Sequence, residues 1–113
     1  MAELTVVEAA DNFTHVAIKG TLDSSGVDIV DLELTSQTLP RRKPAIIDLR
    51  EVGLITSLGI GMLVAVVRAL RAHGLASAVV ATHTVAGVLR MTSIDELVPV
   101  VDTPEEALHL LQV

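Results

Sequence analysis

The sequence lacks cysteine, tryptophan and tyrosine, and Phe13 is its only aromatic residue. Without cysteine the chain can form neither disulfide bonds nor thiolate metal sites, and this residue type says nothing about its redox compartment. Half of its 113 residues are nevertheless hydrophobic, so the core must be built from valine, leucine, isoleucine and alanine. A chain of this length is enough for one hydrophobic core, which predicts one domain over residues 1–113.

Basic residues are also scarce. The chain has 8 lysines and arginines against 14 aspartates and glutamates, which gives a net charge of −6. Binding to a nucleic-acid backbone needs a concentrated basic patch. The only basic cluster, Arg41–Lys43, is short and stands just before Pro44, so we interpret it as a solvated loop. We therefore expect no nucleic-acid partner.

Long apolar runs are missing as well. The uncharged stretch Leu54–Val67 is shorter than the roughly 20 residues that a membrane-spanning helix requires, and a buried helix explains it better. The first residues, Met1–Leu4, lack the basic region of a secretory signal. These features predict a protein without a membrane span, located in the cytoplasm.

The residue patterns of catalytic and metal sites are not found either. Ser57 is not in a Gly-x-Ser-x-Gly turn, because Ile55 stands at the first glycine position. Gly59 and Gly61 begin a dinucleotide-binding fingerprint, but Val64 stands where its third glycine belongs. The histidines have no metal-ligand spacing, and we expect each of them on the surface: His15, His73, His83 and His109. We predict that the chain is not an enzyme, has no catalytic or metal-binding residues and needs no cofactor.

The hydrophobic pattern that is present predicts strands alternating with helices after an initial hairpin. Val16 and Ile18 alternate with other side chains as in a strand, whereas Val30 and Leu34 recur at helical spacing. The apolar run from Pro44 to Leu49 is typical of a strand buried on both faces. The predicted strands are 3–9, 14–19, 44–49, 76–81 and 98–101, and the predicted helices are 25–39, 57–73, 84–91 and a last one after Thr103. This order predicts an α/β domain with a mixed sheet of about five strands and helices packed against it.

Two helix ends have specific signals. Arg71 lies in the last turn of helix 57–73, where a cation suits the helix dipole, and Gly74 is a natural C-terminal cap. In the last helix, Thr103 is followed by a proline and then by Glu106, which predicts a capping box.

A hydroxyl pair, Thr56-Ser57, lies where a charged turn after strand 44–49 leads into the apolar helix 57–73. Side-chain oxygens at this position can accept hydrogen bonds from first-turn N–H groups, so the pair is expected to cap the helix. A hydroxyl at a surface turn is also a good phosphate acceptor, because the added dianion would lie beside the positive end of the helix dipole. The spacing alone leaves both interpretations open.

Gly59 and Gly61 follow in the first turns of the same helix. One interpretation is close packing of the helix against a strand or loop. The other is a flat exposed surface that a partner can approach closely, and we expect both to apply. Asp23, after the second strand, is interpreted equally as a turn or cap residue and as part of a binding surface.

Three segments together resemble the STAS family, which includes sulfate-transporter tails and anti-sigma factor antagonists. Thr56-Ser-Leu-Gly-Ile-Gly61 is similar to the Asp-Ser-Ser/Thr-Gly-Leu-Gly motif of the antagonists, with Thr56 in place of the acid and Leu58 in place of the second hydroxyl residue. The serine that the family phosphorylates falls on Ser57. Gly20–Asp23 is similar to the family's Gly-Glu-Leu-Asp turn, and Ser93–Ala107 to its closing strand and last helix.

The resemblance implies a STAS domain that acts as an anti-sigma factor antagonist and regulates transcription by partner switching. The unphosphorylated chain would bind an anti-sigma factor with a GHKL-type serine kinase fold, which carries ATP and Mg²⁺ itself. Phosphorylation of Ser57 would end the complex, and a phosphatase would be a further partner. The surface that the resemblance assigns to partner binding is Asp23, Ser24, Thr56, Ser57, Leu58, Gly59 and Gly61.

Two other functions remain open at this stage. The chain could be an accessory subunit of a membrane lipid-transport complex that docks on an ATPase subunit without phosphorylation, since the apolar Leu58 also suits a constitutive interface. Alternatively, it could be a module that binds a small ligand or nucleotide through the loops of Asp23 and Ser57.

Overall fold

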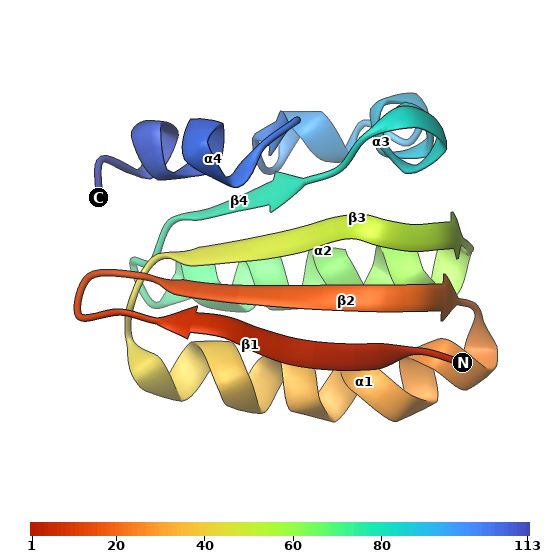
Figure 1. The fold of residues 1–113 in the computed structure, drawn as a ribbon, viewed down its shortest axis with the longest axis horizontal. Helices are drawn as coiled ribbons and strands as arrows, with labels where there is room; N and C mark the ends of the chain where they lie inside the picture. The colour runs from red at the N-terminus through yellow and green to blue at the C-terminus, as the bar shows by residue number, and fades with distance from the viewer.

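The computed structural model describes residues 1–113 as one α/β domain (Figure 1). Two short 3₁₀ turns, Leu39–Arg41 and Ile94–Glu96, lie in the connections between the main elements. The strands are β1 (Glu3–Ala9), β2 (Thr14–Leu22), β3 (Ala45–Ile55), β4 (Ser77–Val80) and β5 (Val100–Val101), and the helices are α1 (Ser24–Thr38), α2 (Ser57–Ala72), α3 (His83–Met91) and α4 (Pro104–Leu111). None of these helices has both the length and the apolar character needed to cross a membrane.

The five strands form one mixed sheet in the order β1-β2-β3-β4-β5. β1 and β2 make an antiparallel hairpin, and β2, β3, β4 and β5 run parallel to one another. Each parallel connection passes through a helix, as parallel pairing requires. The predicted mixed sheet of about five strands is therefore confirmed. β5 is shorter than predicted, and it begins only after Pro99, which has no N–H to give to a ladder.

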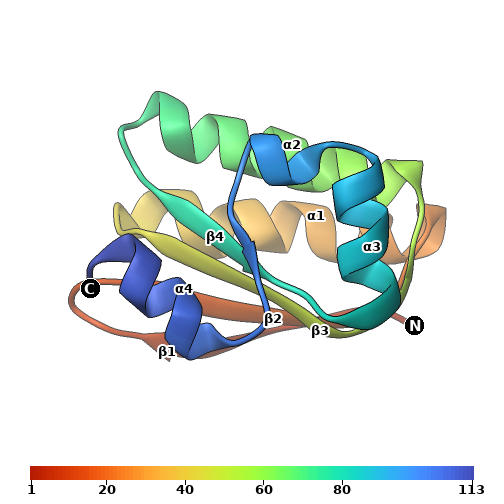
Figure 2. The same ribbon diagram turned by 90° about the horizontal axis from the view of Figure 1, so that it is seen from above.

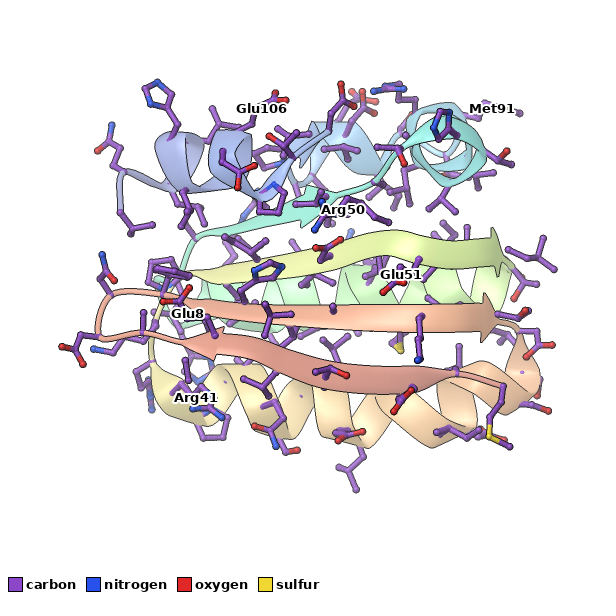
Figure 3. All side chains as sticks on the ribbon, viewed as in Figure 1. Glu8, Arg41, Arg50, Glu51, Met91 and Glu106 are labelled. Atoms are coloured by element: carbon purple, nitrogen blue, oxygen red, sulfur yellow. The ribbon has the colours of Figure 1, made fainter.

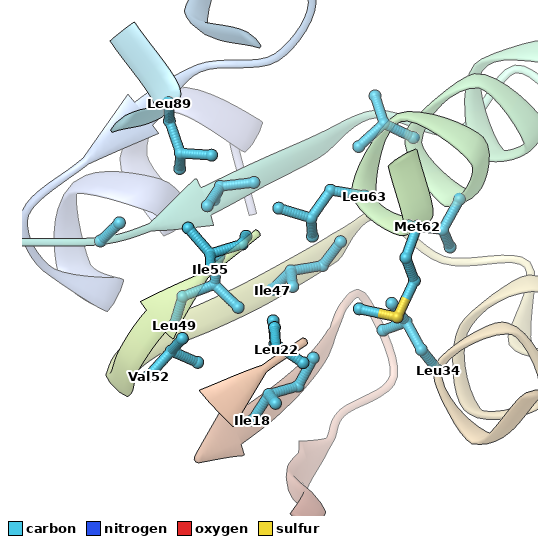
Figure 4. Packing of buried hydrophobic residues seen from close by; sticks show 14 of the residues in the cluster. Ile18, Leu22, Leu34, Ile47, Leu49, Val52, Ile55, Met62, Leu63 and Leu89 are labelled. Atoms are coloured by element: carbon cyan, nitrogen blue, oxygen red, sulfur yellow. The ribbon is translucent and has the colours of Figure 1, made fainter. Parts of the chain in front are cut away.

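Side chains that alternate along the strands divide the core between the two faces of the sheet. Ile18 and Ile47 belong to the main core with residues of α1, α2 and α3, such as Leu34 and Leu63 (Figure 4). On the opposite face α4 places Ala107 against Ile46 and its neighbours in β4. Figure 2 shows α1 and α2 on one side of the sheet and α4 on the other. The part of this second face that β1 and β2 contribute has no helix over it (Figure 1).

Strand β3 is longer than predicted. The sequence indicated a strand over 44–49 and then a charged turn, but β3 continues to Ile55. Its pairing with β2 shifts twice, so that β3 carries two extra residues as bulges. After Leu49 burial therefore recurs at every third residue, Val52 and Ile55, and the neighbours Arg50 and Glu51 are both exposed. With these two bulges β3 continues as a strand to Ile55, the residue before the hydroxyl pair.

Both predicted helix ends are confirmed in their main contacts. Gly74 follows α2 with a φ of +72°, and its N–H donates to the Arg71 carbonyl oxygen at 2.9 Å. In α4 the Thr103 hydroxyl accepts from the Glu106 N–H at 3.1 Å. The return contact of the capping box differs, because the Glu106 carboxylate lies 3.4 Å from the Thr103 hydroxyl and not at a backbone N–H.

The expectation that all histidines lie on the surface is wrong for His15. Only 8% of His15 is exposed, and its Nε2 lies 3.0 Å from Oδ2 of the buried Asp48. The same carboxylate accepts bonds from Nε and Nη2 of Arg50, and its Oδ1 accepts the Arg50 backbone N–H at 3.1 Å. Asp48 thus satisfies the backbone at a bulge of β3 and ties β3 to β2. His73, His83 and His109 are exposed as expected.

The Asp48 cluster predicts a loss of stability in acid. Burial acts to raise the pKa of Asp48, but the hydrogen bonds from His15 and Arg50 outweigh it and hold the pKa well below its usual range. Because the folded pKa lies below the unfolded value of about 3.9, this stabilisation is complete above that pH and is lost as the pH falls through the folded pKa. Asp48→Asn should cost about 2 kcal/mol at pH 7. Urea unfolding at pH 7 and pH 3 should show this cost shrinking in acid, and an equal cost at both pH values would contradict the assignment.

Candidate functional site

The hydroxyl pair lies at the edge of the sheet where β2 and β3 both end. Leu22, the last residue of β2, is the register partner of Ile55, the last residue of β3. Because the two strands are parallel and adjacent, the segments that follow them leave the sheet side by side. The Thr56 N–H donates to the Leu22 carbonyl oxygen at 3.0 Å, so the loop before α2 is fixed to the loop before α1. The loops of Asp23 and Ser57, which the sequence analysis assigned to one surface, therefore lie side by side.

Thr56 does not cap α2 with its side chain, contrary to our expectation. It occupies the N-cap position with extended backbone, but its hydroxyl donates to the Leu22 carbonyl oxygen at 3.0 Å. A hydroxyl used as a donor to the neighbouring loop is not directed at the first-turn N–H groups. No side chain caps α2, and no acidic residue lies in its first turn. The positive end of the α2 dipole therefore has no anionic group of its own helix beside it.

Ser57 is the first residue of α2 and is exposed to solvent. No hydrogen bond involves its hydroxyl, and in particular no histidine, lysine or carboxylate is bonded to it. A serine without an adjacent base is not activated as a nucleophile of its own protein. An exposed, unpaired hydroxyl is instead accessible to the active site of another enzyme.

Two exposed leucines flank Ser57 in the sequence. Leu58 is 53% exposed and Leu54 is 54% exposed. Exposed leucines so near in sequence to an exposed hydroxyl are suited to a contact with another protein, which would remove them from water. The sequence indicated Leu58 but missed Leu54, because residues after Leu49 were expected to form a turn. In β3, which continues past Leu49 with two bulges, Leu54 is exposed and the next residue, Ile55, is buried.

Asp23 caps α1, which agrees with the first of the two interpretations given above. Its carboxylate accepts the Gly26 N–H at 2.9 Å. Ser24 and Ser25 follow it in the first turn of α1, and both are exposed. Asp23 itself is half-buried, so it serves mainly to hold the loop, while the two serines are the accessible hydroxyl groups there.

The two glycines of α2 differ from each other. Gly59 is buried, and a Cβ atom there would lie 2.7 Å from Cγ1 of Ile55 and 2.9 Å from Cβ of Leu22. Gly59 thus lets α2 pack closely on the ends of β2 and β3, and our expectation that it forms an exposed surface together with Gly61 is wrong. Gly61 is exposed, and no heavy atom lies within 4 Å of the position of its Cβ. The flat exposed position is therefore Gly61 alone.

The family comparison agrees with this fold and motif. The model of the STAS domain matches residues 5–107. The chain therefore belongs to the STAS domain family. A comparison with curated protein sequences finds no significant match.

Solved structures with the same fold include anti-sigma factor antagonists. One from Mycobacterium paratuberculosis is 22% identical, with a TM-score of 0.77 over 98% of this chain and 96% of that chain. A putative anti-sigma factor antagonist from Thermotoga maritima is 21% identical, with a TM-score of 0.82 over 98% and 94%. The phosphorylated form of SpoIIAA, a Bacillus cell fate determinant, is 15% identical, with a TM-score of 0.66 over 96% and 98%. At these identities the similarity establishes the fold.

Proposed function

We propose that the chain is an anti-sigma factor antagonist that is inactivated by phosphorylation of Ser57. The observation that carries the proposal is the geometry of Ser57: an exposed hydroxyl without a partner, at the uncapped N-terminus of α2, flanked by the exposed Leu54 and Leu58. The similar fold of SpoIIAA, which has been solved in a phosphorylated form, supports it. The chain would act in the cytoplasm, through a protein partner and not through catalysis.

The switch is electrostatic. A phosphate on Ser57 adds about −1.5 to −2 charges at pH 7. The free N–H groups of the first turn of α2 favour an anion at this position, so the modified chain keeps its fold. A partner surface formed around a neutral hydroxyl and two leucines then faces a dianion that it cannot solvate. The complex is lost although the fold is retained.

The kind of partner is implied by the resemblance to STAS antagonists, and the chemistry of Ser57 agrees with it. The chain has no base beside Ser57 that could activate it, so another protein that binds ATP and Mg²⁺ would transfer the γ-phosphoryl group of ATP to the Ser57 hydroxyl and release ADP. We propose an anti-sigma factor with a GHKL-type serine kinase fold, which releases its sigma factor when this chain binds. A phosphatase that removes the phosphate would return the chain to its binding form.

The exposed leucines also support a second function. Leu54 and Leu58 would suit a permanent interface, as expected for an accessory subunit of a membrane lipid-transport complex. In that case Ser57 would stay unmodified, and loss of Leu58 would weaken docking whatever the supply of ATP. A nucleotide-binding function is not favoured, because neither Asp23 nor Ser57 lines any of the three cavities of the structure.

The phosphate is expected on Ser57 and on no other hydroxyl of this edge. Thr56 is unsuited because its hydroxyl is bonded to the Leu22 carbonyl oxygen, whereas Ser57 is free. Incubation with the cognate kinase and ATP, followed by peptide mass spectrometry, locates the phosphate. Ser57→Ala should remove the signal, and Ser25→Ala, which alters an exposed serine of the neighbouring loop, should retain it. Phosphate on Thr56, Ser24 or Ser25 would overturn the assignment, and no phosphate with an active kinase would favour the accessory-subunit function.

A further inference from the structure

Helix α1 has two large apolar side chains on the side that faces away from the sheet. Its inner side packs on the sheet through Val30 and Leu34, which are fully buried. Leu32 lies about 200° around the helix from Val30, and 80% of it is exposed. Ile29, three residues before Leu32, is 48% exposed, and residues at this spacing are neighbours on a helix surface. The two side chains therefore form one apolar patch in contact with solvent.

Carboxylates border this patch on both sides. In a heptad with Ile29 at position a and Leu32 at position d, Asp28 takes position g and Glu33 takes position e. Both acidic residues are exposed. Side chains at e and g lie beside the a/d contact of two packed helices, and their charges decide which partner helix is accepted. We call these four residues the α1 outer face.

The negative charge of the α1 outer face is not neutralised within the chain. The ion pairs of the structure all lie on the sheet, and none includes Asp28 or Glu33. Lys19 and Arg41 flank α1 in the sequence, but each has another partner. Lys19 Nζ lies 3.1 Å from a carboxylate of β1. Arg41, labelled near the end of α1 in Figure 3, donates to the side-chain oxygen of Gln37 at 2.7 Å. The apolar patch is thus bordered by carboxylates without a cationic partner.

We propose that the α1 outer face docks an amphipathic helix of another protein, with large apolar side chains at its a and d positions and lysine or arginine at its e and g positions. The apolar side chains would pack against Ile29 and Leu32, and the cations would pair with Asp28 and Glu33. A second copy of this face is unsuited, because its carboxylates would meet like charges in either helix orientation. An anionic lipid surface would be repelled for the same reason.

The contact is small. The adjoining a and d positions are Ser25 and Ser36, which have no large apolar group, so the apolar contact is confined to one heptad. We therefore expect a weak and reversible complex. Because the α1 outer face does not include Ser57, the proposal is independent of the proposed phosphorylation switch.

The probe is a synthetic helical peptide of about three heptads, with isoleucine at a, leucine at d and lysine at e and g. Added to the ¹⁵N-labelled chain at constant ionic strength, it should cause saturable shifts of amides in α1 and leave those of Leu54–Leu58 in place. A peptide with glutamate in place of each lysine should not bind. A peptide that keeps the lysines but has alanine at a and d should bind roughly tenfold more weakly or less.

Matched variants of the chain test the apolar contact. Leu32→Gln should fold normally, since the side chain is exposed and glutamine is a good helix former, and should weaken peptide binding roughly tenfold. Leu110→Gln makes the same change at an exposed leucine of α4, on the other face of the sheet, and should leave binding unchanged.

Charge reversal tests the carboxylates. The double variant Asp28→Lys/Glu33→Lys should reverse the preference, so that it binds the glutamate peptide and no longer binds the lysine peptide. Equal binding of both peptides by the unaltered chain, unchanged binding by Leu32→Gln, or shifts centred on Leu54–Leu58 would each overturn the proposal. Dimerisation of the unaltered chain through α1 would also overturn it, because a second copy would then be the occupant.

Discussion

Ser57→Asp is expected to fold like the wild-type chain and to bind the anti-sigma partner roughly a hundredfold more weakly. The fold should tolerate the change because a carboxylate at the first position of α2 lies beside the positive end of the helix dipole. This interaction stabilises the folded chain by about 0.3–1 kcal/mol. Binding should fail because the carboxylate would enter the proposed contact, in which the exposed Leu54 and Leu58 take part and which has no partner for a charge. Titration calorimetry with the purified kinase measures the affinity, and thermal unfolding checks the fold.

Two variants separate charge at Ser57 from charge in general. Ser57→Ala should bind at nearly wild-type affinity and should remain bound when ATP is added. Ser36→Asp adds the same charge to an exposed position near the far end of α1 and should bind normally. The loss in Ser57→Asp should also lessen at high ionic strength, since part of it is electrostatic. If Ser57→Asp binds as tightly as the wild-type chain, phosphorylation does not act by charge.

The sequence was sufficient to predict the order of strands and helices, because their hydrophobic periods differ and their ends carry specific residues. It was not sufficient for β3 after Leu49. There each bulge adds one residue, so the burial period becomes three, which matches neither a strand nor a helix. A charged pair, Arg50-Glu51, then looks like a turn. Leu54 was missed for this reason alone.

Only part of the site could be predicted from the sequence, and the reason is related. That Ser57 lies exposed at the start of α2 followed from the pattern, whereas the contacts across the sheet did not. Thr56 bonds to Leu22, and His15 to Asp48, over separations of 34 and 33 residues. A single sequence carries no signal for such pairs. The same limit applies to the glycines of α2, since only the neighbouring ends of β2 and β3 distinguish the buried Gly59 from the exposed Gly61.

The difference between the buried Gly59 and the exposed Gly61 leads to the second large effect that we expect. Gly61→Glu should retain the fold, because no heavy atom lies within 4 Å of its Cβ position and replacing glycine in a helix recovers up to about 1 kcal/mol. It should nevertheless reduce partner binding by roughly a hundredfold, because a charged side chain then projects from the second turn of α2, next to the Ser57 contact. Circular dichroism, melting temperature and calorimetry with the kinase measure the two properties separately.

Gly59→Glu is the matched change two residues earlier, and the outcome should be reversed. Its side chain would have to enter the space held by Ile55 and Leu22, at 2.7 Å and 2.9 Å from the Cβ position, and it would bury a carboxylate. We expect destabilisation by about 3 kcal/mol or more, because overpacking and an unpaired buried charge act together. Gly61→Ala, which adds a single methyl group on the exposed side, should raise stability by up to about 1 kcal/mol and leave binding near wild type. If Gly61→Glu unfolds, α2 packs differently from the structure described above. If it folds and still binds tightly, the partner contacts another face, and the proposal that Ser57 controls the complex must be abandoned.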